Sequence, residues 1–148
     1  MNHADDESPP NALWTEWVQA SRQHAEGDLP ESLVEAGPRV FAASEYLATS
    51  CLRAPAMLLE LWREGDLEHG FGIGEMEERL RQHLADVRGE EDLGVALRGF
   101  RRHQMVRIIW RDITRTASLD ETLEDLTALA DACIRLALER LYASLVES

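Results

Sequence analysis

Six arginines in one short stretch are the residues of this sequence best suited to chemistry. They fall within 18 residues that hold a single acid, Asp112, and they are Arg98, Arg101, Arg102, Arg107, Arg111 and Arg115. At about 100° per residue of a helix, the first three lie together and the last three form a stripe on another side. Because a guanidinium group binds two phosphate oxygens at once, the pattern suits phosphate recognition.

The same arginines could instead pair with acids inside the protein. The segment that follows is acidic, and it carries Asp120, Glu121, Glu124, Asp125, Asp131 and Glu139. We expect this pairing rather than phosphate binding, because two consecutive helices should be neighbours. Exposed pairs of this kind would each add only about 0–1 kcal/mol.

The other reactive residue types form no recognisable centre. The carboxylates lack the D-x-D arrangement on a strand edge that holds Mg²⁺, and the five histidines lack the spacing of metal ligands. All 15 basic residues are arginine, which excludes a lysine nucleophile or P-loop lysine. We therefore predict no catalytic residue and no metal ligand. Cys51 and Cys133 have apolar neighbours and are expected as small core residues.

Composition limits the class of protein. A chain of 148 residues with 45% hydrophobic residues suits a single soluble domain. The net charge of −13 argues against nucleic acid and against anionic membranes as partners. No apolar run reaches the roughly 18 residues of a membrane span, and the polar, acidic N-terminus is unlike a secretory signal. These features predict a cytoplasmic protein.

Helical periodicity runs through the sequence, and no strand pattern survives inspection. Residues 70–74 are rich in glycine and predict a flexible linker, while Ser118 and Glu121 form a capping box. In the first half of the sequence we predict a helix at residues 12–26, a short helical turn at 31–36, a helix that starts at Gly37-Pro38, and a helix from Pro55 through Trp62. In the second half we predict a helix at residues 75–87, a long helix that is capped by Asp92 and ends near Thr116, and a last helix after Ser118.

The last predicted helix carries a stripe with alternating steps of four and three residues. Such a stripe is a seam for packing against another helix, and its members are Leu119, Leu123, Leu126, Ala130, Cys133, Ala137 and Leu141. The predicted fold is all-α, a bundle of about five to seven helices that ends in a long antiparallel helix hairpin. Residues 1–11 are expected as a disordered acidic tail and residues 12–148 as one helical domain.

Several segments, in the right order, resemble one family, the bifunctional glutamate–ammonia-ligase adenylyltransferases. The resemblance runs from about Leu33 to Tyr142. Its segments are residues 39–46 (RVFAASEY), 53–55 (RAP), 97–102 (LRGFRR), 107–112 (RIIWRD), 123–132 (LEDLTALADA) and 138–142 (LERLY). They resemble the helical region ahead of the family's first nucleotidyltransferase core.

The resemblance implies a role in nitrogen regulation. Members of the family are much longer and contain two similar halves. One half removes AMP from a tyrosine of glutamine synthetase by phosphorolysis, which yields ADP, and the other adds AMP from ATP. Both halves use Mg²⁺ held by carboxylates in a G-K-L-G…S-D-x-D type motif, and glutamine and the PII signalling protein set the direction. This sequence contains neither motif, so no residue here inherits a metal-ligand role.

From the resemblance we expect the N-terminal part of the deadenylylating half, with the nucleotidyltransferase core absent. Such a segment would buttress the core and present Arg101, Arg102 or Arg111 to a phosphate or an acidic partner. Its partners would be the rest of the adenylyltransferase chain, glutamine synthetase and PII. Mg²⁺ and ATP or ADP are implied for the full-length family, with no cofactor in this chain. Whether the chain has enzyme activity stays open, and the alternative is a free-standing helical protein-interaction module.

Overall fold

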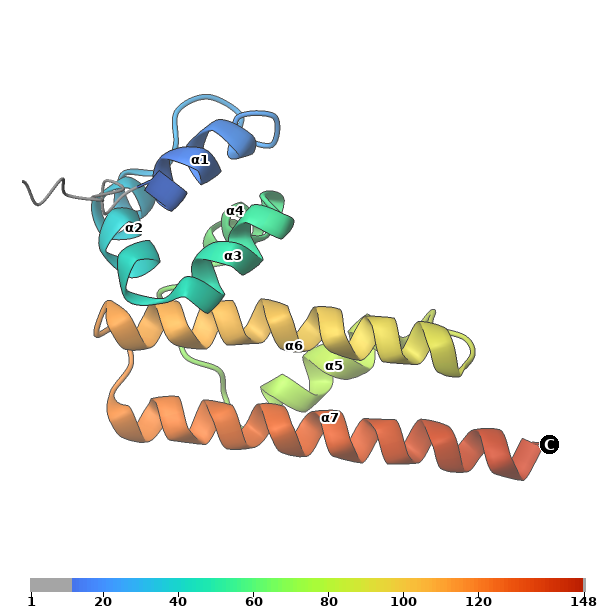
Figure 1. Ribbon diagram of the computed structural model, residues 1–148. Coiled ribbons are helices and arrows are strands. Elements are labelled where there is room, and N and C mark those ends of the chain that lie inside the picture. The colour runs from blue at the N-terminus through green and yellow to red at the C-terminus, as the bar shows by residue number, and fades with distance from the viewer. Residues whose placement is uncertain (1–11, 148) are drawn as a thin grey trace, which may run out of the picture. The chain divides into compact units, whose positions relative to one another are not determined.

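The computed structural model describes residues 12–147, which form seven α-helices and no strand (Figure 1). The predicted all-α fold is therefore confirmed, whereas the predicted acidic tail at residues 1–11 lies outside the described residues. The chain divides into two compact units, one ending at Leu67 and the other starting at Glu68. None of the described helices combines the length and the apolar composition that a membrane span requires.

The first unit holds four short helices around an aromatic core. They are α1 (Ala12–Ser21), α2 (Glu31–Ala43), α3 (Glu45–Arg53) and α4 (Ala56–Arg63). The rings of Trp14 and Trp17 stack with centroids 5.1 Å apart, and Phe41 meets Trp14 edge-on at 5.1 Å. Gly37 lies directly against this cluster, because a Cβ there would come within 2.3 Å of the Trp14 ring.

The helix boundaries of this unit correct two sequence predictions. Pro38 does not start a helix but lies inside α2, and the break falls at Ser44 instead. Pro38 has no amide to donate to the Val34 carbonyl, and Val34 is 49% exposed. Ser44 adopts an extended backbone, and its hydroxyl accepts a hydrogen bond from the Leu47 amide at 3.2 Å, which starts α3.

The first helix is also shorter than the prediction of residues 12–26, since α1 ends at Ser21. The chain then turns, with the His24 amide donating to the Ser21 carbonyl at 2.9 Å. Arg63 of α4 donates to the His24 carbonyl at 2.9 Å, so this turn is fixed by a residue 39 positions away. Such a long-range partner cannot be read from local periodicity.

The second unit consists of α5 (Glu75–Leu84), α6 (Glu90–Ile113) and α7 (Leu119–Glu147). The two long helices lie side by side as a hairpin, which confirms the predicted ending of the fold, and α5 packs against them (Figure 1). The shared core consists of Met76, Leu80, Leu84, Leu93, Phe100, Ile108, Leu129, Ala132 and Leu136.

The start of α6 differs from the prediction that Asp92 caps it. Gly89, with a φ of 82°, precedes the helix, which already begins at Glu90. Asp92 therefore lies within the first turn together with Glu90 and Glu91. Three carboxylates at this position stabilise the positive end of the helix dipole, so the acidic run contributes through charge rather than through a side-chain cap.

The start of α7 confirms half of the predicted capping box. The Glu121 amide donates to the Ser118 hydroxyl at 3.1 Å, as an N-cap requires. The Glu121 carboxylate, however, accepts a hydrogen bond from Arg111 at 2.7 Å, so it serves a tertiary contact.

We predict that Ser118→Ala lowers the free energy of unfolding by about 0.5–2 kcal/mol, because the amide of Glu121 loses its acceptor. Thermal or urea denaturation of both proteins measures the difference. The exposed Ser144, which lies inside α7, offers the matched control, and Ser144→Ala should change stability by less than about 0.5 kcal/mol. Equal effects of the two substitutions would argue against the cap.

Polar contacts fix α5 to α7. Arg81 donates to both carboxylate oxygens of Glu139, at 3.1 and 3.2 Å, and Arg135 binds Glu77 at 3.3 Å. Arg140 donates to the carbonyls of Leu84 and Val87. Because the last carbonyls of a helix lack partners within it, Arg140 satisfies the end of α5, which stops at Leu84 rather than at the predicted Val87.

Candidate functional site

A buried cluster of charged side chains lies between α6 and α7. Arg107 is fully buried and Arg111 nearly so. A terminal nitrogen of Arg107 lies 3.4 Å from the Oδ2 atom of Asp125, and Arg111 lies 2.7 Å from Oε1 of Glu121 and 3.6 Å from the same Oδ2. Two buried arginines thus share two carboxylates, of which Asp125 is nearly buried and Glu121 is 34% exposed.

The spacing along each helix explains how these four residues meet. Arg107 and Arg111 are four residues apart on α6, and Glu121 and Asp125 are four apart on α7, so each pair lies on one helix face. The short connection between the helices turns the two faces toward each other. The expected intramolecular pairing is confirmed for these two arginines, and burial makes the pairs more consequential than exposed ones.

The glycine-containing segment before α5 completes the cluster. The Phe71 ring contacts two guanidinium groups, with its centroid 3.5 Å from Cζ of Arg107 and 4.2 Å from Cζ of Arg79. Arg107 also donates to the His69 carbonyl at 3.3 Å. A Cβ on Gly70 would come within 2.3 Å of Glu121 Oε1. The glycine content predicts a flexible linker at residues 70–74, and in the structure Phe71 contacts Arg107 of the hairpin and Arg79 of α5, whereas Ile73 is fully exposed.

Burial sets the electrostatics of the cluster. Removal from water raises the pKa of the Asp125 carboxyl, because the charged form loses hydration. The guanidinium groups of Arg107 and Arg111 oppose that rise. The carboxylate is therefore held by its arginine partners, and the cluster is occupied by its own charges rather than open to a phosphate.

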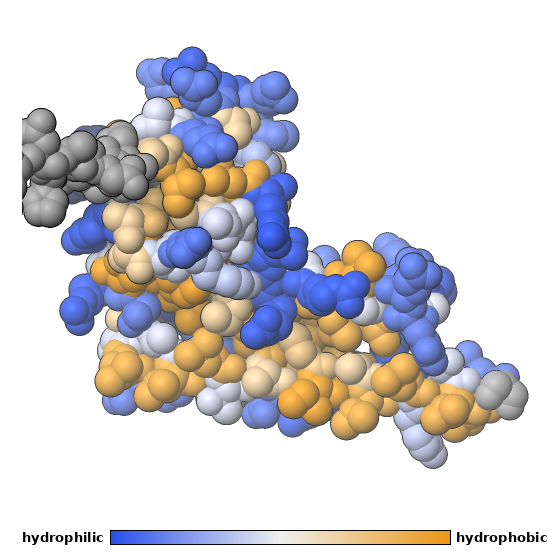
Figure 2. Space-filling model, viewed as in Figure 1, coloured by the Kyte–Doolittle hydropathy of each residue, from blue (hydrophilic) through white to orange (hydrophobic). Residues whose placement is uncertain are grey.

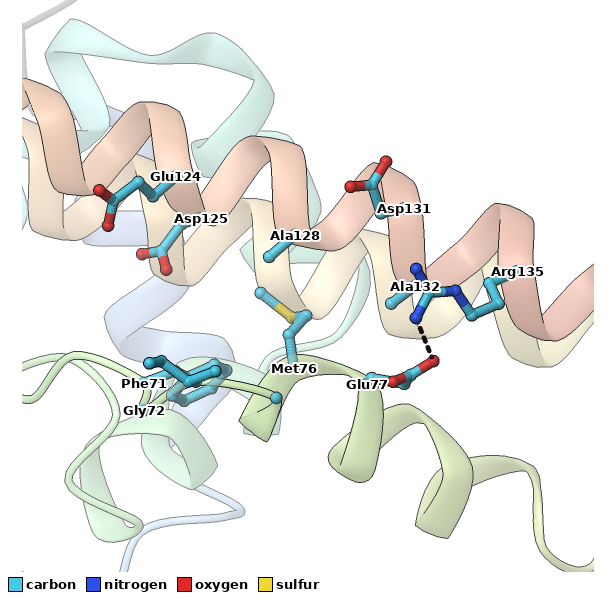
Figure 3. Close-up of a pocket in the computed structure, with 12 residues that line it drawn as sticks. Phe71, Gly72, Met76, Glu77, Glu124, Asp125, Ala128, Asp131, Ala132 and Arg135 are labelled. Atoms are coloured by element: carbon cyan, nitrogen blue, oxygen red, sulfur yellow. Dashed lines mark hydrogen bonds and ion pairs between the residues drawn. The ribbon is translucent and has the colours of Figure 1, made fainter.

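A pocket of about 280 Å³ lies next to this cluster (Figure 3). The ring of Phe71 lies at one end and the ion pair between Glu77 and Arg135 at the other, with Met76 and Ala128 between them. Glu124 and Asp131 of α7 also line it, so carboxylates dominate its polar surface. Within residues 12–147, no three His, Cys, Asp or Glu side chains gather closely enough to hold a metal ion.

The structure separates the three arginines singled out as phosphate or partner ligands. Arg111 is buried and ion-paired, as described above. Arg102 is half-buried and lies about 180° around α6 from Arg111, nine residues away. Arg101 is exposed and lines an apolar groove of about 360 Å³ between α6 and α7. Arg101, Arg102 and Arg111 therefore do not form one site.

Sequence reasoning missed the burial of Arg107 and the presence of Phe71 in the cluster. The sequence predicts that Arg107 pairs with acids but not that it is buried, although its apolar neighbours Val106 and Ile108 are a signal for burial. Phe71 lies among glycines, where nothing in the local sequence reveals that an aromatic ring will meet two guanidinium groups. Only the chain's tertiary structure places it there.

The two cysteines differ in burial and in the pKa of their thiols. Burial raises the pKa of Cys51 to about 12. Cys133 is half-buried in the groove beside Arg101; burial raises its pKa as well, and the charge of Arg101 opposes that rise.

We predict that a thiol reagent at about pH 8 labels Cys133 and leaves Cys51 unlabelled, since the thiolate is the reactive form. Peptide mass spectrometry measures both sites, and urea should make them equally reactive. Rapid labelling of Cys51 in the folded protein would contradict the prediction.

Comparison with known proteins identifies relatives. The glutamate-ammonia ligase adenylyltransferase family matches residues 35–148. A bifunctional glutamine synthetase adenylyltransferase/adenylyl-removing enzyme of Pseudomonas aeruginosa is 50% identical over 113 residues, which cover 76% of this chain and 12% of the relative. A protein of the same description from Pseudomonas syringae pv. tomato is 45% identical over 113 residues, which cover 76% of this chain and 12% of the relative. Another from Shewanella loihica is 32% identical over 134 residues, which cover 90% of this chain and 14% of the relative.

No solved structure matches the chain. The chain spans about an eighth of the length of the relatives named above, so they contain much that has no counterpart here. The family match nevertheless covers well over half of this chain, including the helices that carry the buried cluster. The resemblance predicted from the sequence is confirmed, and the chain belongs to the glutamate-ammonia ligase adenylyltransferase family.

Proposed function

We propose that this chain is the helical segment of a glutamine synthetase adenylyltransferase/adenylyl-removing enzyme, and that it supports the catalytic part without supplying a catalytic group. The observation that carries the proposal is the buried cluster inside the family-matched region. Arg107 and Arg111 form ion pairs with Asp125 and Glu121, and these pairs connect the two helices of the hairpin.

The architecture of the second unit suits a structural role in a larger protein. Ion pairs and the Arg140 contacts tie α5 to α7, and the buried cluster ties α6 to α7, so the second unit is held by polar contacts across its helices. Rigid elements of this kind position neighbouring parts of a protein well. In this proposal the segment belongs to the N-terminal part of the deadenylylating half of a cytoplasmic enzyme. The Mg²⁺, ATP or ADP, glutamine synthetase and PII interactions belong to the full-length protein.

A segment exchange tests the proposal. The matching 113 residues of the Pseudomonas aeruginosa relative, which are 50% identical, are replaced by the corresponding residues of this chain. We expect the chimera to remove AMP from adenylylated glutamine synthetase in the presence of phosphate and Mg²⁺. A version with the segment deleted should not, and the isolated chain should release no ADP.

Two results would overturn the proposal. One is turnover by the isolated chain, which would give it catalytic groups of its own. The other is a chimera that melts cooperatively, like the parent enzyme, but does not remove AMP. The melting measurement separates loss of function from failure to fold.

The second candidate is a free-standing helical protein-interaction module. The exposed apolar side chains of α7 favour it, because faces of this kind mark sites of protein contact. A chain that is monodisperse in isolation and unfolds cooperatively would favour the module. A chain that aggregates or melts without cooperativity would favour a segment that needs the rest of an enzyme.

A further inference from the structure

An apolar stripe runs along the outward face of α7, where Figure 2 shows hydrophobic side chains gathered. The stripe's large residues are between 38% and 74% exposed, and they are Leu119, Leu123, Ile134, Leu138, Leu141 and Leu145. The face of α7 that is buried is a different one, formed by Thr122, Asp125, Leu129, Ala132 and Leu136. The predicted seam is divided between the two faces, because Leu126 and Cys133 pack against the core whereas Leu119, Leu123 and Leu141 are exposed.

The shape of this surface fits an α-helix. The stripe adjoins the groove of about 360 Å³ between α6 and α7, because Ile134 lines the groove together with Met105, Leu126 and Cys133. Ile134, Leu138, Leu141 and Leu145 follow one another in steps of four, three and four residues, which match the repeat of a partner helix packed at a shallow angle. Ala130 and Ala137 are small, so a partner backbone can approach closely at these two positions.

Opposite charges border the two edges of the surface. At about 100° per residue, Asp120, Glu124 and Asp131 lie along the edge of the stripe away from α6, and all three are exposed. On the edge formed by α6, Arg101 lines the groove. A partner helix that fits would carry lysine or arginine along the edge facing the three acids.

The charge of the chain and the length of its relatives indicate which molecule would bind this surface. A second copy of this chain is disfavoured, because each copy carries a net charge of −13 and no lysine. In the Pseudomonas aeruginosa relative the matched segment is 12% of the polypeptide, so the remaining sequence is covalently attached and present at high effective concentration.

We infer that α7 and the groove form a docking site for an amphipathic helix from another part of the adenylyltransferase polypeptide. This helix has apolar residues in a heptad pattern and basic residues facing Asp120, Glu124 and Asp131. The inference rests on the proposed function, and it adds the surface and the chemistry of the contact.

Carbodiimide cross-linking tests the occupant directly. The reagent joins a carboxylate to a lysine in contact with it, and this chain has no lysine. In the chimera described above, we expect Asp120, Glu124 or Asp131 to be joined to lysines of the surrounding enzyme within one helical stretch. Links that involve only other carboxylates would overturn the inference, as would links from these acids to the amino terminus of a second copy.

Cys133 provides an independent measurement, because it lies in the groove while Cys51 is buried and unreactive. Thiol labelling of the Cys133 peptide should be at least about tenfold slower in the chimera than in the isolated chain. Ile134→Glu should restore fast labelling in the chimera. Val95→Glu is the matched control, since Val95 is 57% exposed on α6 outside the groove, and it should leave Cys133 protected.

The outcomes separate the two proposals. Equal labelling of Cys133 in the chimera and the isolated chain overturns the docking site, even if the chimera removes AMP. A folded chimera that is inactive but protects Cys133 overturns the proposed function and leaves the docking site standing. Both Ile134→Glu and Val95→Glu lie at exposed positions, so their melting temperatures should match that of the unsubstituted protein.

Discussion

Arg107→Met should lower the free energy of unfolding of the second unit by about 3–5 kcal/mol, because it leaves the Asp125 carboxylate buried without its closest partner. The substitution also removes the hydrogen-bond donor to the His69 carbonyl and the guanidinium group that contacts the Phe71 ring. Urea denaturation gives the size of the effect, and hydrogen exchange of α6 and α7 peptides assigns it to this unit.

Two comparisons make this result specific. Arg135→Met removes an arginine whose side chain is 62% exposed and whose partner is Glu77, so it should cost only about 0–1 kcal/mol. The double variant Arg107→Met with Asp125→Leu should be more stable than Arg107→Met alone, because the buried carboxylate that lost its closest partner is removed as well. A double variant whose loss equals the sum of both single losses would show that the pair is not energetically coupled.

Trp17→Ala should lower the stability of the first unit by about 3–5 kcal/mol. Trp17 is fully buried, stacks on Trp14 with an interplanar angle of 26°, and donates from its indole nitrogen to the Pro55 carbonyl at 3.2 Å. The substitution leaves a cavity and an unsatisfied carbonyl together. Hydrogen exchange of peptides from α1 to α4 measures the effect where it occurs.

Trp62 offers a matched control for this prediction. It is 38% exposed and donates to the Ser32 hydroxyl at the surface, so Trp62→Ala leaves a smaller cavity. We expect a loss of about 1 kcal/mol, near the centre of the range for point mutants. A similar loss for both tryptophans would show that the aromatic cluster does not dominate the stability of the first unit.

The helices could be predicted where local signals agree with tertiary structure. Ser118 caps α7 as its spacing predicts, and the short connection after α6 made a hairpin the expected arrangement. The errors occur where a distant residue overrides a local signal. Pro38 and Gly37 form a strong start signal, yet Gly37 packs against Trp14 within a continuous α2. Likewise, α5 ends at Leu84, whose carbonyl accepts a hydrogen bond from Arg140, 56 residues away.

The site could be predicted only in part. Charge composition indicated that the arginine-rich helix would pair with the acidic one, and Arg107 and Arg111 do so. The heptad seam on α7 was visible as a pattern, but which side of the hairpin it faces depends on the angle at which α5 and α6 cover that helix. Periodicity gives the relative positions of residues around one helix and leaves their direction in the protein undefined.

The contacts between α5 and α7 have a consequence for the order in which the chain folds. Arg81 and Glu139 are 58 residues apart, as are Glu77 and Arg135. Since a ribosome delivers the N-terminus first, α5 is synthesised well before the helix that holds it. The contacts of the first unit all fall before Leu67, so it can fold during synthesis. The second unit can complete its core only after α7 has been synthesised, because Leu129, Ala132 and Leu136 of that helix belong to it.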